Sequence, residues 1–227
     1  MSIIGMPSEW VNLIDPMVPT ILHLVISTWE GMAPPASDAR EDDITVALCR
    51  ALRNNRTARG LMFRIDTQLV ELDPAPGEDL GRLDIAFSPG VPREDIYFCL
   101  ECKRLNVVVN AQVRAYGGEY VTSGMLRFVT GQYARSVAHG GMLAYVLDGD
   151  VARAISNVEA NLRTQHVALR MIKPGVFQPS SILTNDSRIR ETHHRRAHDT
   201  RLFRIHHMFM ARQGNLAQAP ISSGCTG

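Results

Sequence analysis

The stretch that most constrains the fold is residues 81–105, GRLDIAFSPGVPREDIYFCLECKRL, which has the pattern of two β-strands joined by a turn. Residues 82–88 alternate charged or small side chains with apolar ones, and residues 96–100 are almost entirely apolar, as in a buried strand. In an antiparallel hairpin the numbers of facing residues sum to a constant. A turn at the centre of the connection therefore predicts that Asp84 lies opposite Glu101.

Strand periodicity adds a third charged residue to this pair. Side chains two positions apart point to the same face, so Lys103 joins Glu101 while Cys102 points away. Buried or half-buried acids are costly unless they are paired or bind a metal. The arrangement is therefore either a structural ion pair or a divalent-cation site, with oxygen ligands suited to Mg²⁺ and a lysine able to steady a nucleophile or a phosphate.

Asp84, a hairpin and then Glu101-Cys102-Lys103 resemble the core motif of the PD-(D/E)XK nuclease superfamily, although Leu83 stands where the name of the superfamily has proline. The resemblance implies a restriction-endonuclease-like fold in which Asp84 and Glu101 bind Mg²⁺ or Mn²⁺. It implies that the backbone carbonyl of Cys102 is a further metal ligand and that Lys103 assists phosphodiester hydrolysis.

Residues 40–54 predict an amphipathic helix, because apolar residues recur at helical spacing from Ile44 to Leu52. Extending that face back by one turn reaches Glu41, whereas the two aspartates that follow it rotate towards solvent. Acids at a helix start are also explained by the helix dipole alone. The superfamily often has an extra acid on the helix before its sheet, so the resemblance implies that Glu41 is a third catalytic and metal-binding acid.

The order of predicted elements supports an α/β fold. A strand at 61–72 precedes a turn at 73–81 and the hairpin, and the spacing of apolar residues predicts a helix at 119–138 and a buried strand at 142–147. A strand, a crossover helix and another strand form a right-handed unit with parallel strands. The order helix, strand, strand, strand, helix, strand, with a mixed sheet flanked by helices, is that of the restriction-endonuclease-like core.

Two further elements are predicted beyond this core, a helix at 151–171 capped by Asp150 and a strand at 202–210. Residues 1–36 are expected to form an N-terminal extension of short helices, started or broken by prolines, that covers the core or docks a second subunit. We expect a nuclease domain at 37–212 and a disordered tail at 213–227.

Composition sets the class of protein and the source of any affinity for nucleic acid. The chain has 227 residues, 45% hydrophobic and 21% charged, as in globular proteins. The four cysteines form no disulfide framework, the longest N-terminal apolar run is about half of a membrane span, and no basic residue precedes Arg40. We therefore expect a cytoplasmic protein without membrane contact. The net charge of +1 means that binding to a polyanion must come from local clusters.

The one concentrated cationic stretch is residues 187–207, with six arginines and five of the eight histidines. Its Arg195 and Arg196 are candidate phosphate contacts along a nucleic-acid backbone; the alternative is an exposed loop that leads into the last strand. Arg127 and Arg135 on the predicted helix are further candidate contacts, and a solvated helix surface is their alternative.

The leading hypothesis is a Mg²⁺-dependent deoxyribonuclease, an endonuclease in a bacterial restriction or anti-phage system or in a DNA-repair complex, as the resemblance implies. Because no separate recognition module is visible, a partner protein would supply target recognition, and a homodimer is an alternative assembly. A second hypothesis is an inactive module of the same fold that binds nucleic acid or a protein. A third is an unrelated α/β domain with a structural ion pair.

Overall fold

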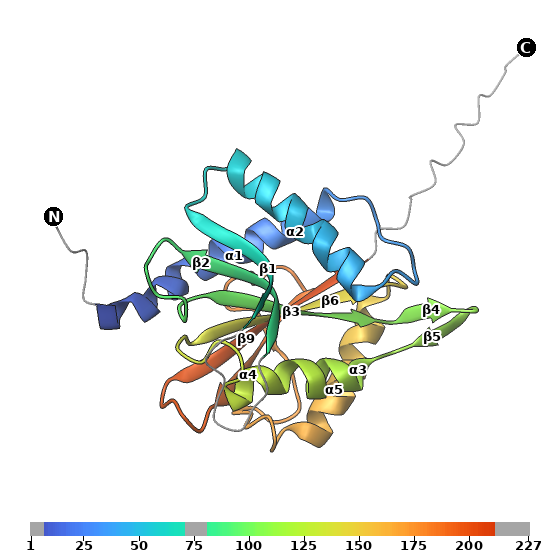
Figure 1. The fold of residues 1–227 in the computed structure, drawn as a ribbon. Helices are drawn as coiled ribbons and strands as arrows, with labels where there is room; N and C mark the ends of the chain where they lie inside the picture. The colour runs from blue at the N-terminus through green and yellow to red at the C-terminus, as the bar shows by residue number, and fades with distance from the viewer. Residues whose placement is uncertain (1–6, 71–80, 212–227) are drawn as a thin grey trace, which may run out of the picture.

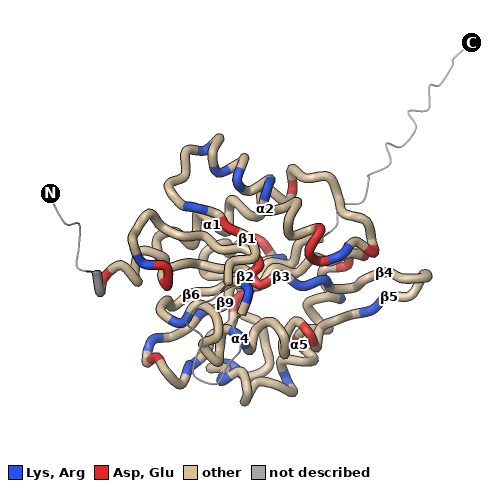
Figure 2. The backbone as a smooth tube through the Cα atoms, viewed as in Figure 1, with Lys and Arg blue, Asp and Glu red and all other residues tan. Residues whose placement is uncertain are grey.

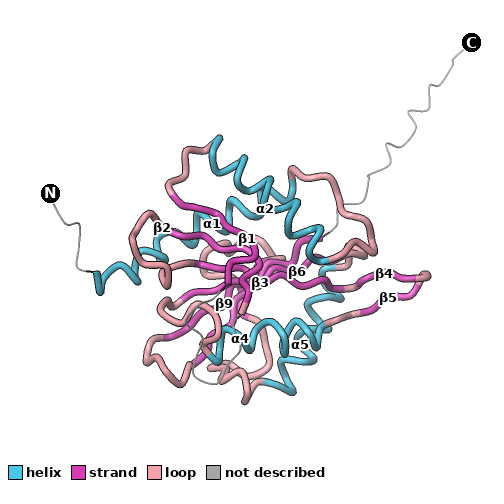
Figure 3. Tube along the Cα trace, in the orientation of Figure 1, coloured by secondary structure: helices cyan, strands magenta, loops and turns pink. Residues whose placement is uncertain are grey.

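A computed structural model describes residues 7–70 and 81–211, so the predicted tail at 213–227 and all but the last residue of the predicted turn at 73–81 lie outside the described residues. The described chain is an α/β structure around a mixed sheet of seven strands in the order β1-β2-β3-β6-β9-β8-β7 (Figures 1 and 3). Helices cover both faces of the sheet. The strands are β1 (Phe63–Val70), β2 (Arg82–Pro89), β3 (Phe98–Leu105), β6 (His139–Val146), β7 (Gln178–Pro179), β8 (Ile189–Arg195) and β9 (Leu202–Ala211).

The predicted pairing of the central strands is confirmed: β2 and β3 are antiparallel, and β3 pairs in parallel with β6 after the crossover. The sheet also pairs β1 antiparallel with β2 and β6 parallel with β9, and the β6–β9 pairing was not predicted. A short hairpin of β4 (Val107–Val109) and β5 (Gln112–Arg114) projects from the end of β3 (Figure 1). Helical crossovers connect the parallel strands, as such connections require.

The helices form two layers (Figure 1). α1 (Ile14–Glu30) and α2 (Glu41–Ala58) pack together on one face, where α2 contacts β1, β2 and β3. On the other face lies a continuous helix of α3 (Gly117–Glu119), the π-helical turn η2 (Tyr120–Met125) and α4 (Leu126–Thr130), together with α5 (Val151–Gln165). The core therefore lies on both sides of the sheet.

Pro7 starts a helical segment, as predicted, but the two prolines that follow do not break α1 into short helices. A 3₁₀ segment, η1 (Pro7–Leu13), leads into the 17-residue α1, which contains Pro19. Pro16 lies in the first turn, where backbone N–H groups have no intrahelical partner anyway, so only Pro19 removes a helical hydrogen bond. Within the described residues, Glu9–Glu30 is long and apolar enough by composition to cross a membrane, and α1 also buries eight residues against the rest of the fold.

Two predicted helix ends are wrong. The helix predicted at 119–138 ends at Thr130, because Gly131 adopts a left-handed conformation with φ of 92° that terminates it. The helix predicted at 151–171 ends at Gln165 and continues as turns. Its predicted cap is confirmed, since the Asp150 side chain accepts a hydrogen bond from the backbone N–H of Arg153.

The cationic stretch at 187–207 is not an exposed loop. Most of it forms the antiparallel pair β8–β9, so the prediction missed a strand at Ile189–Arg195. Three of its five histidines, His194, His206 and His207, are fully buried. The predicted strand at 202–210 is confirmed as β9.

Candidate active site

The two predicted acids lie on adjacent strands, Asp84 on β2 and Glu101 on β3, and Figure 2 shows acidic and basic segments of the backbone close together around these strands. Ile85 pairs with Leu100 in the β2–β3 ladder, and the same register continued by one residue sets Asp84 opposite Glu101. The backbone N–H of Cys102 donates to Asp84 Oδ2 at 2.7 Å. The hairpin register predicted from the sequence is therefore confirmed.

Lys103 lies among three acceptors. Its Nζ is 2.8 Å from Glu101 Oε1, 3.1 Å from Glu41 Oε1 and 2.8 Å from the carbonyl oxygen of Cys102. An ammonium group has three N–H donors, so all of them have a partner here. Burial lowers the pKa of Lys103, but the charges of Glu101 and Glu41 outweigh burial and raise it, so Lys103 is a cation at neutral pH.

Glu41 reaches the site from the first residue of α2. Its Oε1 contacts Lys103, and its Oε2 accepts a hydrogen bond from the backbone N–H of Arg104 at 3.0 Å. Asp42 and Asp43 are exposed, as their rotation around the helix predicted. Glu41 thus joins the predicted site as a partner of Lys103 and of the β3 backbone.

Arg127 lies on α4 and is a second cationic partner of Glu101. Its Nη1 donates to Glu101 Oε1 at 2.9 Å and to the Tyr133 hydroxyl at 2.8 Å. The Tyr133 hydroxyl in turn donates to the backbone carbonyl of Arg82 at 2.9 Å. Sequence reasoning proposed Arg127 only as a nucleic-acid contact and did not single out Tyr133, because its position in a predicted helix gave no sign of a link to β2.

The close approach of η2 to β3 buries Glu101. A Cβ atom added at Gly124 would lie 2.5 Å from the terminal methyl group of Met142 and 3.7 Å from Glu101 Cγ, so the π-helical turn packs directly over both side chains. The Glu101 side chain is 1% exposed as a result. Its Oε2 is buried and has no hydrogen-bond partner in the described chain.

Burial and crowding make both acids harder to ionise. Burial first, and then the charge of Asp84, raise the pKa of Glu101 to about 7, against the opposing effects of Lys103 and Arg127. Burial also raises the pKa of Asp84, while the N–H of Cys102 and the charge of Lys103 lower it. With Glu41, the site holds three carboxyl groups against two cationic side chains, so it has an excess of acidic groups.

Carboxylate oxygens, which Asp84 and Glu101 supply, are the ligands that a hard divalent cation prefers. Among the described residues, no group of three or more His, Cys, Asp and Glu side chains is arranged to hold a metal ion. Mg²⁺ in proteins commonly uses only one or two carboxylates, with water and substrate phosphate as its other ligands. Asp84 and the unpartnered Oε2 of Glu101 fit this pattern. Glu41 and the Cys102 carbonyl, also predicted as ligands, bond to Lys103 instead.

The four arginines proposed as nucleic-acid contacts lie in different environments. Arg127 is 37% exposed at the site, and Arg135 and Arg195 are exposed on loops and strand ends. The Arg196 side chain is 0% exposed and donates to the carbonyls of Ala134 and Val137. This buried position leaves Arg196 no surface for the predicted phosphate contact.

The residues of the candidate site thus come from α2, β2, β3 and α4. The first and last of these residues, Glu41 and Arg127, are 86 positions apart in the sequence. Lys103 and Arg127 approach Glu101 Oε1 from different elements. Searches for similar proteins, made against family models, curated proteins and solved structures, give no match to this chain.

Proposed function

We propose that this chain is a metal-dependent nuclease that hydrolyses phosphodiester bonds in DNA, with a core of the PD-(D/E)XK type. The observation that carries the proposal is the meeting of Asp84, Glu101 and Lys103 on adjacent strands, with Glu41 contacting Lys103. The order α2, β1, β2, β3, a crossover helix and a parallel β6 supports it, because this is the order of elements that the resemblance to the superfamily implies.

Asp84 and Glu101 would hold the Mg²⁺ or Mn²⁺ ion, which when bound supplies an activated water and neutralises charge at the phosphate. Lys103 keeps its proton and presents it to the attacking water or to the oxygens of the phosphorane-like transition state. Glu41 orients the ammonium group through its contact at 3.1 Å. Arg127, held by Tyr133, offers a second cation beside Glu101 for the non-bridging oxygens of the phosphate.

Purified protein should cut plasmid, linear or single-stranded DNA in Mg²⁺ or Mn²⁺ and not in EDTA. The Asp84→Ala variant should lose both cleavage and divalent-metal binding, because Asp84 is one of the two acids in the proposed ligand set. Circular dichroism of the variant checks that the fold is retained. Cleavage by Asp84→Ala at the wild-type rate would exclude this function for the site.

One observation favours a second candidate, a module of the same fold that binds nucleic acid without cutting it. Lys103 and Arg127 both contact Glu101 Oε1, and the Cys102 carbonyl accepts a hydrogen bond from Lys103, so these oxygens already have partners inside the protein. Such a protein would retain DNA in a binding assay and leave it intact in every divalent metal tested.

A further inference from the structure

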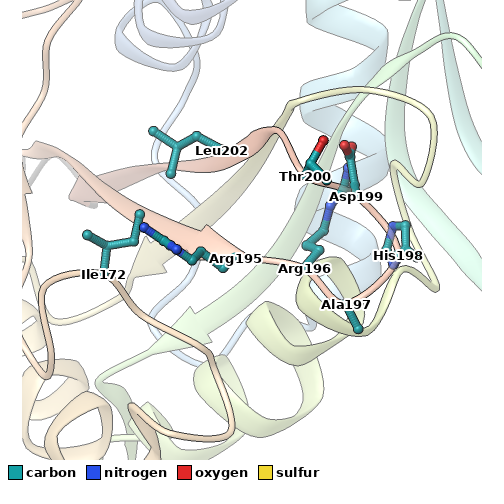
Figure 4. A pocket seen from close by; sticks show the side chains of 8 residues that line it. All are labelled: Ile172, Arg195, Arg196, Ala197, His198, Asp199, Thr200 and Leu202. Atoms are coloured by element: carbon teal, nitrogen blue, oxygen red, sulfur yellow. The ribbon is translucent and has the colours of Figure 1, made fainter.

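A second polar site lies at the far end of the β8–β9 pair, in a cavity of about 740 Å³. It differs from the candidate active site in mixing apolar and cationic walls (Figure 4). The lining residues that matter here are Ile172, Arg195, Arg196, His198, Asp199 and Leu202.

Arg195 is the unpaired cation of this cavity. Its side chain is exposed, and it forms no ion pair within the described chain, although its backbone N–H donates to the carbonyl of Arg170 at 3.1 Å. Leu202 is its direct partner across the β8–β9 ladder. Figure 4 shows the Arg195 side chain extending towards Ile172 and away from Asp199. A guanidinium in this setting is available for two parallel hydrogen bonds to a phosphate.

The other charges of the cavity strengthen its positive field. Asp199 accepts from both Arg196 and Arg201, and although burial raises its pKa, these hydrogen bonds outweigh burial and lower the pKa to about 2. Asp199 is therefore ionised and neutralises only one of the two arginines. Together with Arg195, the cluster keeps an excess of positive charge.

The apolar wall lies beside the unpaired guanidinium. Ile172 is 43% exposed and Leu202 is 41% exposed, both high for large aliphatic side chains. Binding pockets commonly combine apolar walls with a few placed polar groups. An anion attached to a flat apolar group fits this combination, and a nucleotide has both parts.

One loop, residues 131–138, connects this cavity with the candidate active site. The Tyr133 hydroxyl in this loop accepts a hydrogen bond from Arg127, which contacts Glu101. Other residues of the same loop contact the cavity lining: the carbonyls of Ala134 and Val137 accept from Arg196, and a Cβ atom at Gly131 would lie 2.4 Å from the His198 ring. The two sites are therefore linked through the contacts of a single loop.

We propose that this cavity binds one nucleotide of a single-stranded segment of DNA, with the phosphate on Arg195 and the base against Ile172 and Leu202. The proposal rests on the proposed function for the class of ligand. Arg196 contributes charge and anchors the loop, and Arg195 makes the phosphate contact.

The test measures binding of a fluorescent 5′-phosphorylated oligothymidylate to the full chain in EDTA, where no cleavage occurs. Arg195→Ala should weaken binding about tenfold, because it removes a charge-assisted contact, and should flatten the log-log salt dependence by about 0.7. Arg50→Ala, which removes an exposed arginine on α2, is the matched control and should bind as the wild type does.

The apolar wall is tested in the same assay with Leu202→Ala, for which Val167→Ala is the control at another exposed apolar position. Leu202→Ala should weaken binding several-fold with an unchanged salt slope. Wild-type affinity in both Arg195→Ala and Leu202→Ala, or no binding by the wild type, would overturn the proposal. Pocket-dependent binding by a protein that cuts DNA in no metal would remove the nuclease function and leave this inference standing.

Discussion

At the residue scale, Glu101 is the residue on which the candidate site depends. Its Oε1 forms ion pairs with Lys103 and Arg127, and its Oε2 has no hydrogen-bond partner in the described chain. A buried carboxylate paired on one oxygen alone is costly to the fold. Clusters of buried titratable groups with shifted pKa values are typical of functional sites.

Lys103 should act on the transition state more than on the metal. Lys103→Ala should lower the rate of DNA cleavage by a factor of about 10² or more while nearly retaining Mn²⁺ affinity, because Lys103 is a cation and not a ligand. Lys173→Ala removes the other lysine of the chain, which is exposed beyond α5, and should cut at the wild-type rate. Equal losses in the two variants would indicate a general effect of charge.

In the absence of metal, the repulsion between Asp84 and Glu101 should lower the free energy of unfolding. Asp84→Asn keeps an oxygen that can accept from the N–H of Cys102, and it removes the repulsion between Asp84 and Glu101. We expect its free energy of unfolding in EDTA to rise by roughly 1 kcal/mol, as for other substitutions that relieve a strained functional site. Urea unfolding measures this change, and a variant less stable than the wild type would show that Asp84 has a structural role.

At the scale of elements, the sequence allowed the β2–β3 register to be predicted because strand periodicity is two and a hairpin fixes which residues face each other. The contact of Arg127 with Glu101 was not predictable in the same way. The π-helical turn η2 changes the phase of the helix before Arg127, and no residue pattern marks such a turn. β8 was missed because its charged and polar residues, IRETHHR, hide the alternation of a strand.

The β8–β9 pair should make stability depend on pH. Burial lowers the pKa of His194 to about 4 and lowers the pKa values of His206 and His207 well below the ordinary range. Between the ordinary pKa of about 6.5 and these lower values, the unfolded chain binds more protons than the folded chain. The free energy of unfolding should therefore fall as pH falls from 7 to 5, by up to about 1.4 kcal/mol per pH unit for each histidine.

Urea unfolding at several pH values tests this expectation with two matched variants. His207→Gln removes a buried histidine that bonds to Tyr120 and Thr192, and it should reduce the pH slope by nearly one proton even though the variant is less stable. His23→Gln removes an exposed histidine and should leave the slope unchanged. The same slope in the wild type and in His207→Gln would mean that this histidine does not titrate on unfolding.

At the scale of the whole molecule, the sheet places two polar sites at separate positions around α4. The Asp84 and Glu101 pair lies where β2 and β3 run beside the helix, and the Arg195 cavity lies at the ends of β8 and β9. Residues 131–138 contact both sites. Arg195 and Arg135 are exposed at the surface, whereas Arg196 is buried by its hydrogen bonds to the loop.

The most direct test of the central claim is the rate of DNA cleavage in Mn²⁺ by two isosteric variants of buried glutamates. Glu101→Gln removes the charge that pairs with Lys103 and Arg127, whereas Glu191→Gln alters a buried acid on β8 that pairs with His193. The nuclease proposal predicts that Glu101→Gln loses at least about 10²-fold in rate and that Glu191→Gln cuts within about threefold of the wild type. Cleavage by Glu101→Gln at the wild-type rate, with the fold retained, would contradict it.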